Sequence, residues 1–190
     1  VVPKFREAAV EMPWPDPKRW EEQIAAFEAA DKEAMPPTGA IVATGSSSMR
    51  GWHGTIKRDL APLTVIPRGF GGSNFNDLYH YLERVVVPYK PRAVLIYEGD
   101  NDIAGGLFTD SVIAKFTETT QAIRQWLPET RIYVLSIKPS PSREKFWPDA
   151  QKINEAMKKA CDADPMMTYI DIATPMLGPD GKARPELFGT

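Results

Sequence analysis

The sequence predicts a three-layer α/β domain in which helices cover both faces of a parallel sheet. Short apolar segments, many of them β-branched, alternate along the chain with longer segments whose apolar residues recur at helical spacing. Alternation of this kind builds βαβ units, and such units form parallel sheets. The length of 190 residues is that of one domain with a substantial core.

Five segments are expected to be strands because each is short, apolar and followed by turn residues. They are Ala40–Ala43, Thr64–Pro67, Ala93–Tyr97, Ile132–Ile137 and Thr168–Ile172. Helices are expected between the strands, and the clearest has one apolar face and ends before a proline. The expected helices are Phe75–Val87, Ser111–Leu127 and Pro148–Asp162. If Met49–Leu60 begins as a helix, Ser47 lies near its positive end.

The chain divides into two parts on this reading. Residues 1–38 are expected to form a proline-rich arm and a helix, Pro17–Ala34, that pack on the body. Residues 39–190 form the domain itself. Cys161 falls at helical spacing with apolar neighbours, so we expect it to be buried, and a single cysteine excludes an internal disulfide.

Composition excludes several classes of function. The net charge of −2 and the lack of a basic run exclude a nucleic-acid partner. No apolar stretch reaches the roughly 20 residues that a transmembrane helix needs. Two isolated histidines give no metal-ligand spacing, and no phosphate loop or dinucleotide motif is present, so we expect no metal and no cofactor. A soluble protein is expected; the compartment, including a secreted or periplasmic one, and homodimerisation stay open.

Glycines and small polar residues follow each of the first three expected strands. The three segments are Gly45–Ser48, Arg68–Asn74 and Glu98–Asp102. One such segment alone is typical of a turn or helix cap. Three at the carboxyl edge of one parallel sheet favour a ligand site, because backbone N–H groups and short side chains can converge there.

These segments resemble the motifs of the SGNH (GDSL-type) hydrolases. G-S-S-S stands in place of the commoner G-D-S, and R-G-F-G-G-S and G-D-N-D are similar to the second and third motifs. The runs V-V-P-Y-K-P-R and Y-V-L-S-I-K-P-S-P also resemble one branch of that family, and the resemblance covers the chain from Ala40 onward. It implies a flavodoxin-like fold with strand order 2-1-3-4-5 and hydrolysis of carboxylic esters with short acyl or acetyl groups.

The resemblance also implies the roles of three residues. Ser47 would be the nucleophile, and the oxyanion hole would consist of the backbone N–H groups of Ser47 and Gly72 and the side-chain amide of Asn101. An acyl-transfer enzyme needs these two parts, an exposed hydroxyl and fixed donors to the developing oxyanion. The partner would be a small-molecule ester. Structural roles are expected for the neighbouring polar residues Asn74, Asp77 and Asp102.

The catalytic base is expected outside the sequence given. The family supplies it in a C-terminal D-x-x-H motif, and the segment ending at Thr190 resembles the residues that precede this motif. His53 and His80 are poor substitutes, because in helices they would lie about 9 Å along the axis from Ser47 and about 12 Å from Gly72. We therefore expect a C-terminally truncated esterase. The alternative is a non-catalytic relative that binds acyl or carbohydrate ligands.

Overall fold

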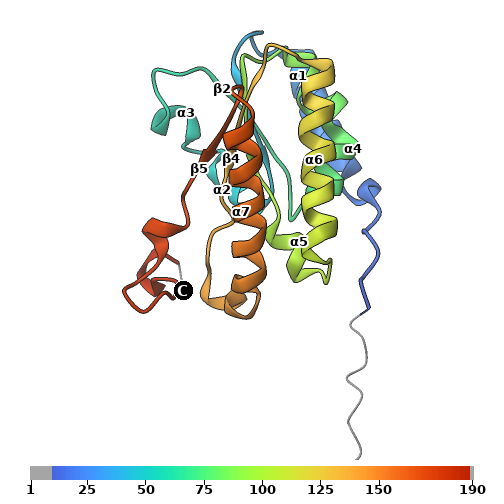
Figure 1. The fold of residues 1–190 in the computed structure, drawn as a ribbon. Helices are drawn as coiled ribbons and strands as arrows, with labels where there is room; N and C mark the ends of the chain where they lie inside the picture. The colour runs from blue at the N-terminus through green and yellow to red at the C-terminus, as the bar shows by residue number, and fades with distance from the viewer. Residues whose placement is uncertain (1–9, 189–190) are drawn as a thin grey trace, which may run out of the picture.

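The computed structural model describes residues 10–188, which form a central sheet with helices packed against it (Figure 1). All five strands are parallel, and their order is β2-β1-β3-β4-β5. The strands are β1 (Ile41–Gly45), β2 (Val65–Gly69), β3 (Ala93–Tyr97), β4 (Arg131–Leu135) and β5 (Met167–Ile170). The predicted fold class and strand order are confirmed.

Helices lie on both faces of the sheet. The α-helices are α1 (Glu21–Glu33), α2 (Ser47–Trp52), α3 (Ile56–Asp59), α4 (Phe75–Val85), α5 (Asp100–Ala104), α6 (Thr109–Trp126) and α7 (Trp147–Ala163). Helices α4 and α6 lie side by side on one face, and α3 lies on the opposite side (Figure 1). Within residues 10–188, no helix is long and apolar enough to cross a bilayer, and no group of three acidic, histidine or cysteine side chains could hold a metal ion.

The segment after Ser47 begins as a helix but does not continue as one. Residues 49–60 are divided between α2 and α3, with a turn at His53–Thr55 between them. Gly54 in that turn disfavours a continuous helix because glycine loses more conformational freedom than other residues on becoming helical. The imidazole of His53 bonds across to β2 instead, where its Nε2 accepts from the Gly69 N–H at 3.0 Å.

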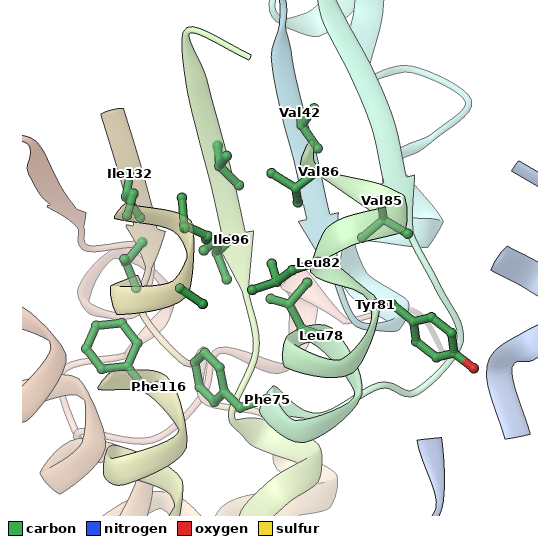
Figure 2. Packing of buried hydrophobic residues seen from close by; sticks show 14 of the residues in the cluster. Val42, Phe75, Leu78, Tyr81, Leu82, Val85, Val86, Ile96, Phe116 and Ile132 are labelled. Atoms are coloured by element: carbon green, nitrogen blue, oxygen red, sulfur yellow. The ribbon is translucent and has the colours of Figure 1, made fainter. Parts of the chain in front are cut away.

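The core is divided by the sheet into two apolar clusters. Alternate residues of β1 and β3 face opposite sides, so Val42 and Ile96 belong to the larger cluster, and Ala43 belongs to the smaller one under α2 and α3. Figure 2 shows the larger cluster, in which Phe75 of α4 meets Phe116 of α6, their ring centroids 5.7 Å apart. Cys161 of α7 is buried there, as predicted.

The segment before β1 is attached to the body by polar contacts. The N–H of Met12 donates to the carbonyl of Gly106, and the indole Nε1 of Trp20 donates to Asp77 Oδ2 at 3.0 Å. Helix α1 is held by an ion pair between Asp31 and the largely buried Arg68 of β2. These contacts place the arm from residue 10 onward against α4 and the loop after α5; the first nine residues of the predicted arm lie outside the described residues.

Candidate active site

Strands β1, β2 and β3 end level with one another at the carboxyl edge of the sheet. Gly45 is paired with Gly69 on one side and with Tyr97 on the other. Two further backbone bonds continue the alignment into the loops, from the Ser46 N–H to the Tyr97 carbonyl at 3.0 Å and from the Phe70 N–H to the Gly45 carbonyl at 2.9 Å. The three polar segments therefore leave the sheet at the same edge.

Gly45 has a conformation that only glycine adopts readily. Its φ is +130°, and a Cβ atom at this position would lie 2.0 Å from the Tyr97 carbonyl oxygen. The turn after β1 can therefore press against β3 without a side chain between them. This close approach directs the following serines out of the sheet.

The three serines of the first motif have different environments. Ser46 is fully buried, and its hydroxyl has no hydrogen-bond partner among the described residues. Ser47 is the first residue of α2 and is exposed to solvent. Ser48 is half-buried, and its Oγ accepts a hydrogen bond from the Lys138 ammonium at 2.6 Å. Of the three hydroxyls, that of Ser47 is the most accessible to a substrate.

Gly72 and Asn101 lie next to each other. A Cβ atom built on Gly72 would be 3.7 Å from Asn101 Nδ2, and that nitrogen donates to the carbonyl of the adjacent Ser73 at 2.8 Å. One amide proton of Asn101 is used in this bond, which leaves the other free. The Gly72 N–H has no acceptor within residues 10–188. Two donors are thus unpaired at one place, the arrangement that stabilises an oxyanion.

Buried carboxyl groups join the loops that carry Gly72 and Asn101. Ser73 donates its hydroxyl proton to Glu98 Oε1 at 2.5 Å, and the Phe75 N–H donates to Asp102 Oδ1 at 3.0 Å. Burial raises the pKa of Asp102 to about 7 and that of Glu98 well above its ordinary value; the negative charge of Asp102 adds to the effect on Glu98.

The start of α4 is fixed by a reciprocal cap. The Asn74 side chain accepts from the Asp77 N–H at 2.8 Å, and the Asp77 carboxylate accepts from the Asn74 N–H at 3.0 Å. Asn74, Asp77 and Asp102 thus have the structural contacts expected from the sequence.

Two basic residues from the segment after β4 complete this edge, and the sequence reasoning gave neither a role. Lys138 reaches Ser48 and also donates to the Tyr97 hydroxyl at 3.1 Å. Arg143 donates from Nη2 to Asn101 Oδ1 at 2.7 Å. The sequence feature that could have indicated a role for them is their position in I-K-P-S-P-S-R. This segment directly follows the fourth strand, where parallel sheets place ligand-binding residues.

Neither histidine is hydrogen-bonded to Ser47. The Nε2 of His53 accepts from the Gly69 N–H, and burial, then Arg68 and Arg50, lower the pKa of this imidazole below 6.5. His80 is exposed on α4, and its ring packs against Tyr81 with centroids 4.7 Å apart. Both imidazoles of the described residues thus have other neighbours, and a base for Ser47 is not evident from their contacts.

Solved structures show the same fold at low sequence identity. A Streptococcus pneumonia protein provisionally described as a platelet activating factor has a TM-score of 0.78 at 18% identity, over 90% of this chain and 83% of its own. A Bacteroides fragilis protein provisionally described as an acylhydrolase has a TM-score of 0.74 at 18% identity, over 94% of this chain and 88% of its own. A GDSL-like lipase from Bacteroides thetaiotaomicron has a TM-score of 0.66 at 20% identity, over 92% of this chain and 86% of its own.

Comparison at the level of sequence assigns the family. No curated protein matches the chain. The profile of the GDSL-like lipase/acylhydrolase family matches residues 37–190, which include β1 and all three motif loops. A match over most of the chain, together with the shared fold, shows that this protein belongs to the GDSL-like lipase/acylhydrolase family.

Proposed function

We propose that the protein hydrolyses carboxylic esters of short acyl groups through an acyl-enzyme on Ser47. The observation that carries the proposal is the meeting of two unpaired donors, the Gly72 N–H and the second Asn101 amide proton, at the sheet edge where Ser47 is exposed. Membership of an acylhydrolase family supports ester hydrolysis in general. The role of Ser47 is inferred from the motif resemblance and its exposure, and those of Gly72 and Asn101 from the resemblance and their unpaired donors.

The reaction would proceed in two steps. Ser47 Oγ attacks the ester carbonyl while its proton passes to a base, and the tetrahedral intermediate collapses to the acyl-serine as the alcohol leaves with a proton. Water then attacks the acyl-serine and releases the acid. In both steps negative charge develops on the carbonyl oxygen, and donors that are already oriented stabilise it without reorganisation.

The donors would come from three segments. The N–H of Ser47 is available because the first amides of a helix have no intrahelical acceptor. Gly72 would supply a second N–H, and Asn101 would supply Nδ2. Losing one donor of this kind costs about 3 kcal/mol of transition-state stabilisation, or roughly 10²–10³ in kcat.

The base and its acid would come from the D-x-x-H motif of the family. This part of the proposal rests on the two histidines of the given sequence, one of which bonds to β2 while the other is exposed on α4. If no such motif exists in the natural protein, the site would bind acyl or carbohydrate ligands without turning them over. The same assay distinguishes the two outcomes.

The test uses the natural full-length protein and chromogenic acetyl and butyryl esters. We expect turnover that Ser47→Ala abolishes, and we expect Asn101→Ala to lower kcat by about 10²-fold with little change in KM, because its bond strengthens in the transition state. Exposed Ser142→Ala serves as the control for serine removal. Equal rates in wild type and Ser47→Ala would exclude the proposed mechanism.

A further inference from the structure

Arg143 holds the side chain of Asn101 from the side opposite to Ser73. Its Nη2 donates to Asn101 Oδ1 at 2.7 Å, whereas Asn101 Nδ2 donates to the Ser73 carbonyl at 2.8 Å. The amide is therefore bonded at both ends, to a donor through its oxygen and to an acceptor through its nitrogen. Nδ2 also lies near Gly72, 3.7 Å from the place of a built Cβ atom, and its second proton has no acceptor within residues 10–188.

Arg143 is itself held in place. Its Nη1 lies 3.0 Å from Asp100 Oδ2, and this carboxylate is only 13% exposed. The backbone of Arg143 departs from helical geometry inside the 3-10 helix Pro141–Phe146, with φ −122° and ψ 20°. Nη1 thus forms an ion pair with Asp100, and Nη2 forms a hydrogen bond with Asn101. Asp100 and Asn101 are successive residues at the start of α5, so the fixed fork of one guanidinium reaches both.

The chemistry of the guanidinium determines which way the amide points. An asparagine amide has nearly the same shape after a 180° flip, but the flip exchanges a donor for an acceptor. Arginine has only donors, so it requires Oδ1 to face it, and Nδ2 then faces the oxyanion position. A flipped amide would place Oδ1 against the developing negative charge.

We propose that Arg143 is a positioning residue that orients Asn101 for oxyanion stabilisation. This inference rests on the proposed function, in which Asn101 is a donor to the oxyanion. Arg143 would act through Asn101, to whose Oδ1 its Nη2 donates. Its loss would lower kcat and leave KM nearly unchanged, because a misoriented amide fails in the transition state more than in the ground state.

The experiment is a double-mutant cycle on the full-length protein with a chromogenic acetyl ester. Arg143→Met should lower kcat by about 10-fold or more, within the roughly 10²–10³ that removal of an oxyanion donor costs. Arg143→Lys should recover part of the loss, because it keeps one donor. In the Asn101→Ala background, Arg143→Met should change kcat by less than about twofold, because residues that act as a unit are not additive.

Control variants distinguish a failure of the positioning role of Arg143 from a failure of the proposed function. Arg58→Met removes an exposed arginine that pairs with Asp59 on α3 and should leave kcat unchanged. If Ser47→Ala retains wild-type activity, the proposed function fails. If Ser47→Ala is inactive but Arg143→Met matches wild type, or lowers kcat equally with and without Asn101, the positioning role is overturned.

A spectroscopic measurement extends the test to variants whose turnover is too slow to measure. The side-chain amide signal of Asn101, assigned by its loss in Asn101→Ala, should shift in Arg143→Met and return toward its wild-type position in Arg143→Lys. An Asn101 signal that is unchanged in Arg143→Met would show that the Ser73 carbonyl alone fixes the amide, and would overturn the proposal. If Arg143→Met does not fold, Arg143→Gln takes its place in the same comparisons, because an amide can accept as well as donate and so no longer requires Asn101 Oδ1 to face it.

Discussion

The ammonium of Lys138 lies 2.6 Å from the Oγ of Ser48, the residue that follows the proposed nucleophile. Burial lowers the pKa of Lys138, and the Asp100 carboxylate 3.9 Å away opposes this shift. A lysine with a lowered pKa can serve as the base of a serine nucleophile in unrelated hydrolases. The contact thus makes Ser48 a rival to Ser47.

Accessibility favours Ser47, and substitution of each serine tests the choice. We expect Ser47→Ala to lower kcat by more than about 10³-fold, as loss of a nucleophile does. Ser48→Ala should lower kcat by less than about 10-fold, because it removes only a neighbour that fixes Lys138. Reaction with a fluorophosphonate followed by fragment-ion mass spectrometry would show which serine carries the adduct. An adduct on Ser48, with Ser48→Ala inactive but folded, would assign the chemistry to the Ser48–Lys138 pair.

His53 is expected to matter for stability and not for turnover. Its Nε2 accepts from the Gly69 N–H, so His53→Ala should lower the free energy of unfolding by about 1–2 kcal/mol and leave kcat within about twofold. His53→Gln supplies an amide oxygen as an alternative acceptor and is the matched control. A large fall in kcat for both variants, with unchanged folding, would identify His53 as the base.

The same histidine gives a pH dependence with a definite sign. Burial lowers its pKa in the folded protein, so as pH falls through about 6.5 the unfolded chain binds the proton first, and stability is lost on acidification. Urea unfolding at pH 5.5 and 7.5 should show a smaller loss for His53→Gln than for wild type. An equal loss in the two proteins would contradict a lowered pKa.

The fold followed from local signals, whereas part of the site did not. Short apolar segments predicted every strand, apolar residues at helical spacing predicted the helices between them, and glycines after three strands predicted where the motif loops gather. The break at His53–Thr55 was missed because the bond from the Gly69 N–H to His53 is a tertiary contact that the periodicity of 49–60 does not encode. Tertiary contacts can override a helical pattern in this way.

Lys138 and Arg143 were missed for a related reason. Both lie in a segment without helical or strand periodicity, and each meets its partner across 42 or more positions of sequence. Nothing local in I-K-P-S-P-S-R says that Arg143 will bond to Asn101. The rule that ligand-binding residues follow the strands of a parallel sheet would have drawn attention to the segment, but not to a particular side chain.

Gly45 should be among the least replaceable residues of the sheet edge. Gly45→Ala would put a Cβ atom 2.0 Å from the Tyr97 carbonyl oxygen at a φ of +130°, so we expect a loss of about 3 kcal/mol or more in unfolding free energy. Gly51→Ala is the control, because no atom lies within 4 Å of a Cβ built there. That substitution lies in α2 and should stabilise the helix by up to about 1 kcal/mol. Equal melting temperatures for the two variants would contradict the steric argument.

The buried carboxyl of Asp102 should make the protein less stable as the pH rises. Its pKa is raised from 3.8 to about 7 by burial, so between these values the folded protein holds a proton that the unfolded chain has released. Stability therefore decreases as pH rises from about 4 to about 7, and it does not recover above that range because the buried carboxylate is then charged. Glu98, whose pKa is also raised, contributes in the same direction.

Asp102→Asn removes this charge while an amide oxygen can still accept from the Phe75 N–H. We expect the difference in unfolding free energy, variant minus wild type, to rise by on the order of 1–4 kcal/mol between pH 4 and pH 8. Any constant cost of burying the amide cancels in this difference between two pH values. Loss of the Asp102 charge also brings the pKa of Glu98 toward its ordinary value, which adds to the rise.

Exposed Glu129→Gln is the control and should give a much flatter difference. The measurement is urea unfolding of the three proteins at intervals from pH 4 to pH 8, and a difference for Asp102→Asn that stays constant or falls with pH would show that this carboxyl is charged in the fold throughout.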